Sequence, residues 1–312
     1  MTDETNLFND IVNEDDDGVR IDKWIATSIP DLSRSYIQKL IDAGEVKVSG
    51  ISISKNSYKL KSGDTVEMNI PKSVLPDILP VNIPLDILYE DDDILVVNKP
   101  KGMVVHPAAG HYDDTLVNAI MYHCGDSLSG INGVMRPGIV HRIDQDTTGS
   151  LVICKNDTSH KILAEQFKVH SINREYRAIA CGNLDQDELR ISGYIGRDSN
   201  NRKRMAVTDA IHGKKAVTNI KLLENLNKFC YVSCMLETGR THQIRVHMNS
   251  IKHPLLGDPL YGNNNGLQIS HKFNGQCLHA YRLGFIHPTT GEYIEFIADI
   301  PDYMNKLIDE LK

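Results

Sequence analysis

Residues 138–156 read GIVHRIDQDTTGSLVICKN and hold the most informative polar side chains of this chain. A short apolar run leads into His-Arg-Ile-Asp, two threonines and a glycine predict a turn, and a second apolar run follows. This change in polarity predicts that Asp144 stands at a junction between a strand and a loop, beside Arg142. A carboxylate in such a place can serve as a nucleophile, a general base, a phosphate acceptor or a metal ligand.

The composition is typical of a globular protein that carries an acidic head. With 312 residues, the chain is long enough for two domains or for one large domain with an appendage. The net charge is −7, but residues 1–19 contain seven acidic residues and no lysine or arginine, which leaves 34 acidic against 34 basic residues elsewhere. We therefore predict a disordered acidic tail over residues 1–18, and a function that depends on local basic patches.

The cysteines and the apolar segments indicate a cytoplasmic location. None of the six cysteines forms a Cys-x-x-Cys pair, so we expect buried, reduced thiols. The acidic N-terminus lacks the basic and apolar regions of a secretory signal, and no apolar run approaches the roughly 20 residues needed to span a bilayer. We expect a monomer in the cytoplasm that has no membrane partner.

The first part of the chain predicts a small helical unit. Residues 19–26 form an amphipathic pattern, and a second helix is bounded by Ser33 as its N-cap and Gly44 as its C-cap. Strands are expected at 45–50 and within 60–70. In this order the elements resemble the S-four-type RNA-binding domain, over residues 19–72. The resemblance implies that Arg20, Arg34 and Lys39 face RNA; the alternative is that they are ordinary solvated charges.

A proline-containing linker is expected at residues 73–84, and beyond it the composition changes. Residues 88–100 predict two short strands around an acidic turn, and helices are expected at 115–124 and 159–167. Strands dominate the rest. The fold class predicted for residues 85–312 is α+β with a large mixed or antiparallel sheet.

Three further blocks carry candidate functional side chains. In 172–182 (INREYRAIACG), strand alternation places Arg174, Tyr176 and Ala178 on one face, although Tyr176 alone could simply pack in the core. A basic stretch at 196–207, with Lys214 and Lys215, provides six bases within 19 residues; it is either a solvated face or a phosphate-binding surface. The third block, 236–248, reads LETGRTHQIRVHM.

Together these motifs resemble the RluA family of pseudouridine synthases, in order, over about residues 19–305, and most closely its RluD branch. Two departures are Ile143 where the family has Leu, a nearly neutral change, and Gln145 where a basic residue is usual. The resemblance implies that Asp144 is essential, that Arg245 pairs with it, that Arg142 fills the space left by a flipped base and that Tyr176 supports this base. The other residues it implies in substrate binding are His141, Thr148, Arg240, His242, Ile244, Arg202, Lys203, Arg204, Arg34 and Lys39.

The reaction implied by the resemblance detaches uracil from ribose, turns it and rejoins it through carbon five, on a stem-loop of large-subunit ribosomal RNA. The target base must leave its stack to be reached. No group is added or oxidised, so we expect no cofactor, which agrees with the absence of dinucleotide and Walker motifs. A buried Asp144 would remain ionised beside a guanidinium. The sequence does not separate a nucleophilic role of Asp144 from that of a base.

Other functions fit the sequence less well. Residues 144–148 match the Asp-x-Asp-x-Thr signature of aspartate-dependent phosphatases, but His141 and Arg142 interrupt the preceding apolar strand. An EF-hand fails because Lys155 stands where the last ligand should be. A zinc site at His242 and His247 fails on spacing, so no metal is predicted. A non-catalytic RNA-binding factor would retain RNA affinity and form no modified base.

Overall fold

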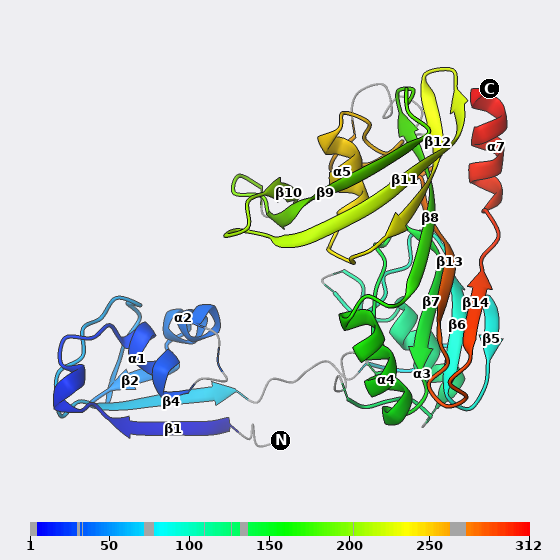
Figure 1. Cartoon of the computed structure of the whole chain (residues 1–312). Helices are drawn as coiled ribbons and strands as arrows, with labels where there is room; N and C mark the ends of the chain where they lie inside the picture. Colours follow the sequence, from blue (N-terminus) through cyan, green and yellow to red (C-terminus); the bar gives the residue numbers. More distant parts are fainter. Residues whose placement is uncertain are drawn as a thin grey trace. The chain divides into compact units, whose positions relative to one another are not determined.

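The computed structural model describes residues 5–29, 32, 34–71, 78–108, 110–125, 127–131, 137–201, 203–262 and 273–312. The chain divides into two compact units, Met1–Asp77 and Ile78–Lys312 (Figure 1), each of which is described by itself. The predicted linker at 73–84 is split by this boundary. Residues 72–77 lie outside the described residues, whereas Ile78 is buried in the core of the second unit.

Two helices and a four-stranded sheet build the N-terminal unit. The helices are α1 (Ile21–Ser28) and α2 (Arg34–Asp42), and the strands follow the order β1 (Thr5–Ile11), β4 (Thr65–Pro71), β2 (Val46–Val48) and β3 (Ile51–Ser52). Gly44 ends α2 as predicted, with φ of 79°, and the amides of Gly44 and Glu45 donate to the carbonyls of Ile41 and Leu40. Ser33, the predicted N-cap, lies outside the described residues.

The acidic head is not disordered between Thr5 and Asp17, so this prediction was wrong. Strand β1 pairs with β4 over its whole length, and a 3₁₀ turn follows at Glu14–Asp16. The prediction rested on the acidic residues and overlooked the apolar ones among them. Phe8 packs edge-on against Trp24, and Val12 is buried. The carboxylate of Asp16 accepts a hydrogen bond from the indole of Trp24 at 3.0 Å. Burial of these few apolar groups explains why the acidic segment is ordered.

A buried carboxylate joins the two helices of this unit. Asp22 is fully buried and accepts hydrogen bonds from the side chains of Arg20, Arg34 and Gln38. Burial alone would raise the pKa of Asp22, but these hydrogen bonds lower it to about 2. Arg20 and Arg34 remain 45% and 51% exposed, so each guanidinium is tethered at one side and open to solvent at the other.

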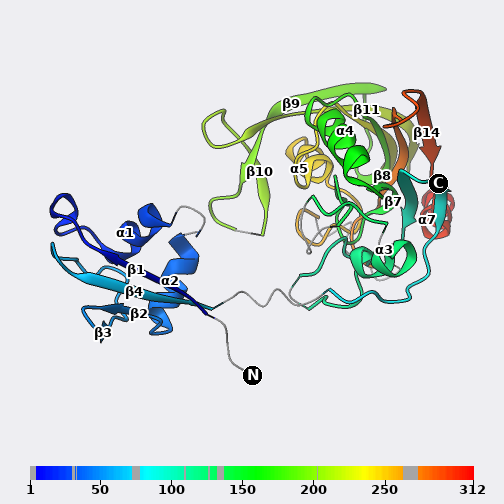
Figure 2. The same cartoon turned by 90° about the horizontal axis from the view of Figure 1, so that it is seen from below.

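The second unit is built on a ten-stranded sheet, and the predicted α+β class is confirmed (Figures 1 and 2). Nine strands form the path β10-β9-β11-β12-β8-β13-β7-β6-β5, and β14 pairs with β13. The sheet is mixed, because β13 runs parallel to β7 while the other described pairs are antiparallel. The strands are β5 (Ile87–Glu90), β6 (Ile94–Lys99), β7 (Thr148–Cys154), β8 (Asn173–Cys181), β9 (Glu188–Arg197), β10 (Met205–Thr208), β11 (Lys214–Leu226), β12 (Phe229–Leu236), β13 (Leu278–Ile286) and β14 (Tyr293–Ile297).

Helices cover both faces of this sheet. Helices α3 (Leu116–Cys124) and α4 (Asp157–Lys168) contribute to separate cores on β6 and β7, α3 against Leu95 and Val97 and α4 against Ile94 and Val96. Because side chains alternate along a strand, these cores lie on opposite faces, and β7 is buried along its whole length. Helices α5 (Gln243–Ser250) and α7 (Asp302–Leu311) cover β8 in the same way.

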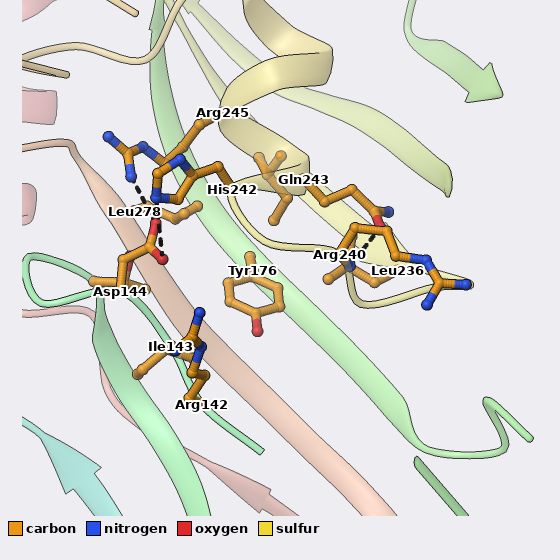
Figure 3. A pocket seen from close by; sticks show the side chains of 12 residues that line it. Arg142, Ile143, Asp144, Tyr176, Leu236, Arg240, His242, Gln243, Arg245 and Leu278 are labelled. Atoms are coloured by element: carbon orange, nitrogen blue, oxygen red, sulfur yellow. Dashed lines mark hydrogen bonds and ion pairs between the residues drawn. The ribbon is translucent and has the colours of Figure 1, made fainter. Parts of the chain in front are cut away.

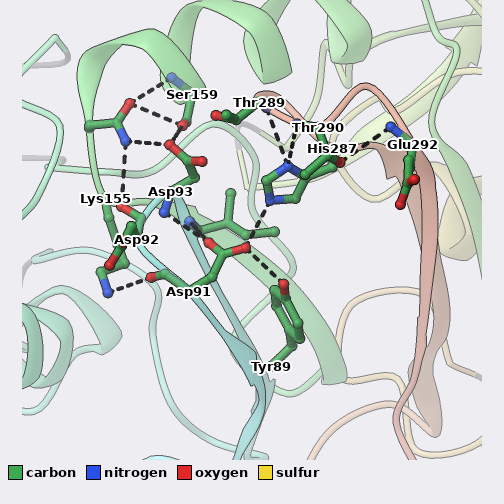
Figure 4. Close-up of polar contacts among 12 residues, drawn as sticks. Tyr89, Asp91, Asp92, Asp93, Lys155, Ser159, His287, Thr289, Thr290 and Glu292 are labelled. Carbon is green, nitrogen blue, oxygen red and sulfur yellow. Dashed lines mark hydrogen bonds and ion pairs between the residues drawn. The ribbon is translucent and has the colours of Figure 1, made fainter.

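The predicted acidic turn between β5 and β6 is tied to the turn between β13 and β14 (Figure 4). Asp91, Asp93 and His287 place potential metal-ligating atoms within 4.8 Å of one another. However, Nδ1 of His287 accepts hydrogen bonds from the amides of Thr289 and Thr290, so Nε2 carries the proton and donates it to Asp91 at 2.9 Å. The side chain of His287 therefore connects the two turns through hydrogen bonds and has a structural role.

We predict that Asp22→Asn lowers the stability of the N-terminal unit by about 2 kcal/mol, because the buried ion pairs are lost. A depressed pKa contributes stability above the unfolded value of about 4 that is lost as the pH falls toward 2, and the variant should lack this dependence. Trp24 is the only tryptophan of the chain, so urea unfolding followed by its fluorescence reports on this unit. Asp15→Asn, an exposed neighbour, is the control, and equal midpoints for Asp22→Asn and the wild type would refute the prediction.

Candidate active site

Asp144 lies in the loop that leads into β7, on the α5 side of the sheet (Figure 3). Its carbonyl accepts a hydrogen bond from the amide of Thr147, which closes a turn directly before the strand. The apolar run before this loop forms only an isolated bridge, between Ile139 and Ile153, where a strand was expected. Asp144 thus precedes a strand instead of following one, and its side chain is 28% exposed.

Arg245 holds the carboxylate of Asp144 from α5. Its Nη1 donates to Oδ2 of Asp144 at 2.7 Å, while Nε and Nη2 donate to the two oxygens of Asp258 at 2.7 and 2.9 Å. Arg245 is almost buried and Asp258 is fully buried. Burial would lower the pKa of Arg245, but the two carboxylates raise it above its ordinary value. The guanidinium is therefore a permanent cation shared by two acids.

His242 approaches the other oxygen of Asp144. Its Nε2 lies 3.8 Å from Oδ1, and its Nδ1 lies 2.9 Å from the hydroxyl of Tyr261. The backbone of His242 is left-handed (φ 57°) directly before α5, a conformation that costs energy in a residue with a side chain. Burial lowers the pKa of His242, which favours the neutral ring at physiological pH.

Two cavities meet at Asp144. A narrow one of about 60 Å³ is lined by the apolar side chains of Leu236, Ile244 and Leu278 and by Tyr176. A wider one of about 400 Å³ extends past Gln145 and Asp146. Both share a wall made of Arg142, Ile143, Asp144, His242 and Arg245. The narrow cavity thus combines apolar side chains with the carboxylate of Asp144 (Figure 3).

Most residues predicted for the active-site region meet at these cavities, but two do not reach them. The ring of His141 stacks on Phe167, its Nε2 accepts a hydrogen bond from the amide of Val152, and burial lowers its pKa to about 3. Thr148 turns its hydroxyl to the buried ring of His279, 2.7 Å away. Both side chains stabilise the sheet beneath the site and do not line the cavities.

The remaining predicted residues belong to other parts of the chain. Arg204 stacks over the ring of Tyr261 at 5.0 Å, and Lys203 is exposed beside it. Arg202 lies outside the described residues. Arg34 and Lys39 belong to α2 of the N-terminal unit.

Sequence reasoning missed three supporting residues: Lys99, Asp258 and Tyr261. The last two stand in a segment, 253–262, that matches the family, but no chemistry singled them out. Lys99 is fully buried, and its ammonium donates to the carbonyls of Pro100, Met103 and Gln145 at 2.7–2.8 Å. Burial lowers its pKa to about 7. Because Gln145 follows Asp144, this lysine fixes the backbone of the loop that carries Asp144.

Known proteins similar to this chain modify RNA. Residues 93–250 match the family described as RNA pseudouridylate synthase, and residues 19–66 match the S4 domain. The uncharacterized RNA pseudouridine synthase YlyB of Bacillus subtilis is 49% identical over 307 residues, 98% of this chain and 99% of that protein. The ribosomal large subunit pseudouridine synthase D of Zymomonas mobilis is 48% identical over 299 residues, 94% of either chain. A solved structure, human RNA pseudouridylate synthase domain containing 1, superposes with a TM-score of 0.57 at 25% identity, over 73% of this chain and 94% of that one.

The chain therefore belongs to the RluA family of RNA pseudouridine synthases. It is an isomerase that acts on RNA and carries an S4 domain at its N-terminal side, as the motifs predicted. Among the helices that the structure describes, none is long and apolar enough to cross a membrane.

We predict that Lys99→Met destabilises the second unit by about 3 kcal/mol, because three buried carbonyls lose their donor. Circular dichroism during thermal or urea unfolding measures the loss. Lys161→Met, an exposed substitution on α4, is the control. A variant as stable as this control would show that Lys99 does not support the loop.

We predict that Asp258→Asn lowers kcat about 100-fold, because Arg245 loses the charge that orients it toward Asp144. KM for RNA should change by less than about twofold, since Asp258 is buried and does not reach the cavities. Release of tritium from RNA labelled at carbon five of uridine measures turnover. Asp185→Asn, an exposed substitution, is the control; a change in KM alone would contradict a positioning role.

Proposed function

We propose that this enzyme isomerises uridines of large-subunit ribosomal RNA in the cytoplasm, and that Asp144 is its catalytic residue. Curated relatives that cover nearly the whole chain are named for this RNA. The observation that carries the proposal is the Asp144 carboxylate, which Arg245 holds at one oxygen and which lines a cavity together with Tyr176, Ile244 and Leu278. We also propose that the enzyme acts as a monomer.

The cavity geometry suggests a division of roles. The target base would enter between Tyr176 on one side and Ile244 and Leu278 on the other, where apolar surfaces suit a flat ring. Arg142 is exposed at the cavity rim and can occupy the space that the base leaves. Arg240 and His242 line the same cavity and can contact the sugar or its phosphates.

The reaction needs a group at the sugar and no external reagent. The bond from C1′ of ribose to N1 of uracil breaks, a bond from C1′ to carbon five forms, carbon five loses its hydrogen and N1 gains one. Asp144 would act either as the nucleophile at C1′ or as a base at the ribose. In both cases Arg245 would hold the carboxylate in place through its hydrogen bond to Oδ2 of Asp144.

The N-terminal unit would bind RNA through α2. Arg34 and Lys39 are exposed there, and Asp22 fixes the direction of the Arg34 guanidinium. A tethered cation loses less side-chain entropy when it meets a phosphate than a free one does. The exposed Lys203 and the half-buried Arg204 would supply further phosphate contacts from the second unit.

The test is pseudouridine mapping by carbodiimide treatment and primer extension on an unmodified large-subunit ribosomal RNA transcript, without added cofactor. We expect wild type and Asp185→Asn to modify the transcript, and Asp144→Asn to be slower by at least about 10³-fold while binding the RNA equally well. An active Asp144→Asn protein, with deamidation excluded by mass spectrometry, would refute the role of Asp144. A wild type that binds but modifies no RNA would favour a non-catalytic binding factor.

A further inference from the structure

A third cavity lies where strands β9, β10 and β11 meet the segment before α5; Figure 2 shows β10 beside α5. We call it the arm cavity. Its volume is about 520 Å³, within the range of sites that bind small ligands. Its lining residues are Ile195, Gly196, Met205, Ile211, His212, Gly213, Lys214, Gly239, Arg240 and Thr241.

The arm cavity combines cations with exposed apolar groups. Lys214 and Arg240 supply the charge, and neither forms an ion pair with any residue that the structure describes. The Nε of Arg240 donates to the carbonyl of Lys215 at 2.9 Å, which fixes the side chain beside the cavity. Ile211 is 88% exposed, the largest exposed fraction among the large apolar side chains described. Ile211 therefore offers an apolar contact surface beside these cations.

A third cation stands behind the wall of this cavity. Arg174 passes so close to Gly239 that any Cβ there would collide with Nη1 of its guanidinium. Its Nε and Nη2 are buried without a hydrogen-bond partner among the described residues. Burial lowers the pKa of Arg174, and the nearby Arg240 lowers it further. Arg174 and Arg240 thus lie near one another at one side of the cavity, and Lys214 adds a further positive charge to its lining. The carboxylate of Asp209 pairs with His212 of the lining and with neither arginine. An anion bound beside the two arginines would relieve their repulsion.

The arm cavity adjoins the active site through a shared residue. Arg240 lines both the arm cavity and the narrow cavity beside Asp144. An RNA strand whose uridine enters the narrow cavity therefore passes Arg240 on its way out. A second nucleotide of the same strand suits this cavity. Its base can contact the apolar surfaces, its phosphate can contact the two cations, and Arg240 links the cavity to the one beside Asp144.

We propose that the arm cavity binds one unpaired nucleotide of the substrate RNA, a neighbour of the target uridine in the strand. Its base packs against Ile211, Ile195 and Met205, and its phosphate lies between Lys214 and Arg240. Arg174 reinforces the positive potential from behind Gly239. This inference rests on the proposed function, because it assumes that the target uridine of the RNA is bound beside Asp144.

The first test measures affinity for an unmodified large-subunit ribosomal RNA transcript by filter binding. Lys214→Ala and Ile211→Ser should each weaken binding about tenfold, and kcat at saturating RNA should stay within about twofold of wild type. Lys214→Ala should also reduce the salt dependence of log Kd by about one unit, whereas Ile211→Ser should leave it unchanged. Lys221→Ala and Leu223→Ser, exposed on the same strand β11, are the matched controls.

The second test locates the nucleotide. A benzophenone side chain introduced at position 211 should cross-link to one nucleotide close to the modified uridine, mapped by primer extension, whereas the same group at position 223 should not. If Lys214→Ala and Ile211→Ser bind like their controls, or if cross-links are absent or scattered, the inference is refuted even though wild type still forms pseudouridine. If wild type forms no pseudouridine but the affinity pattern holds, the proposed function fails and the nucleotide site stands.

Discussion

A single guanidinium between two carboxylates sets the geometry of the second unit around the loop that carries Asp144. Arg245 bridges Asp144 and Asp258, which come from loops on opposite sides of α5 in the sequence. The buried carboxylate of Asp258 has further donors besides Arg245, because its Oδ1 also accepts hydrogen bonds from the amides of Leu260 and Tyr261. The buried acid therefore holds the arginine, and the arginine leaves only one oxygen of Asp144 available. The position of the Asp144 carboxylate therefore depends on Arg245, and the position of Arg245 depends on Asp258.

The site also depends on conformations that are unfavourable in isolation. His242 adopts a left-handed backbone directly before α5, and Lys99 is buried in a region where an ammonium is poorly solvated. Each is compensated by specific partners: Tyr261 for the histidine, and three carbonyls for the lysine. These partners offset the cost of the strained backbone and of the buried ammonium beside Asp144.

Sequence alone predicted much of this arrangement, and its failures have physical causes. Alternation and capping residues located the acidic hairpin, the helix ended by Gly44 and the strand face that carries Tyr176. The roles of His141 and Thr148 were not predictable from their neighbours, because the direction of a side chain depends on contacts such as the one between Thr148 and His279, 131 residues away. Asp258 was missed because a buried acid has no local pattern. The acidic head misled because its charge concealed Phe8 and Val12.

Strand β1 has a consequence for the solution behaviour of the protein. It lies at the end of its sheet, and Leu7 and Ile11 are 68% and 58% exposed there. An open edge with apolar side chains invites strand addition by a second molecule, which is a route to aggregation. Asp10 lies on this strand and the acidic turn Glu14–Asp16 follows it, so two approaching copies would bring like charges together. The same acidic segment thus forms the exposed edge strand and supplies the negative charge that opposes its pairing with a second molecule.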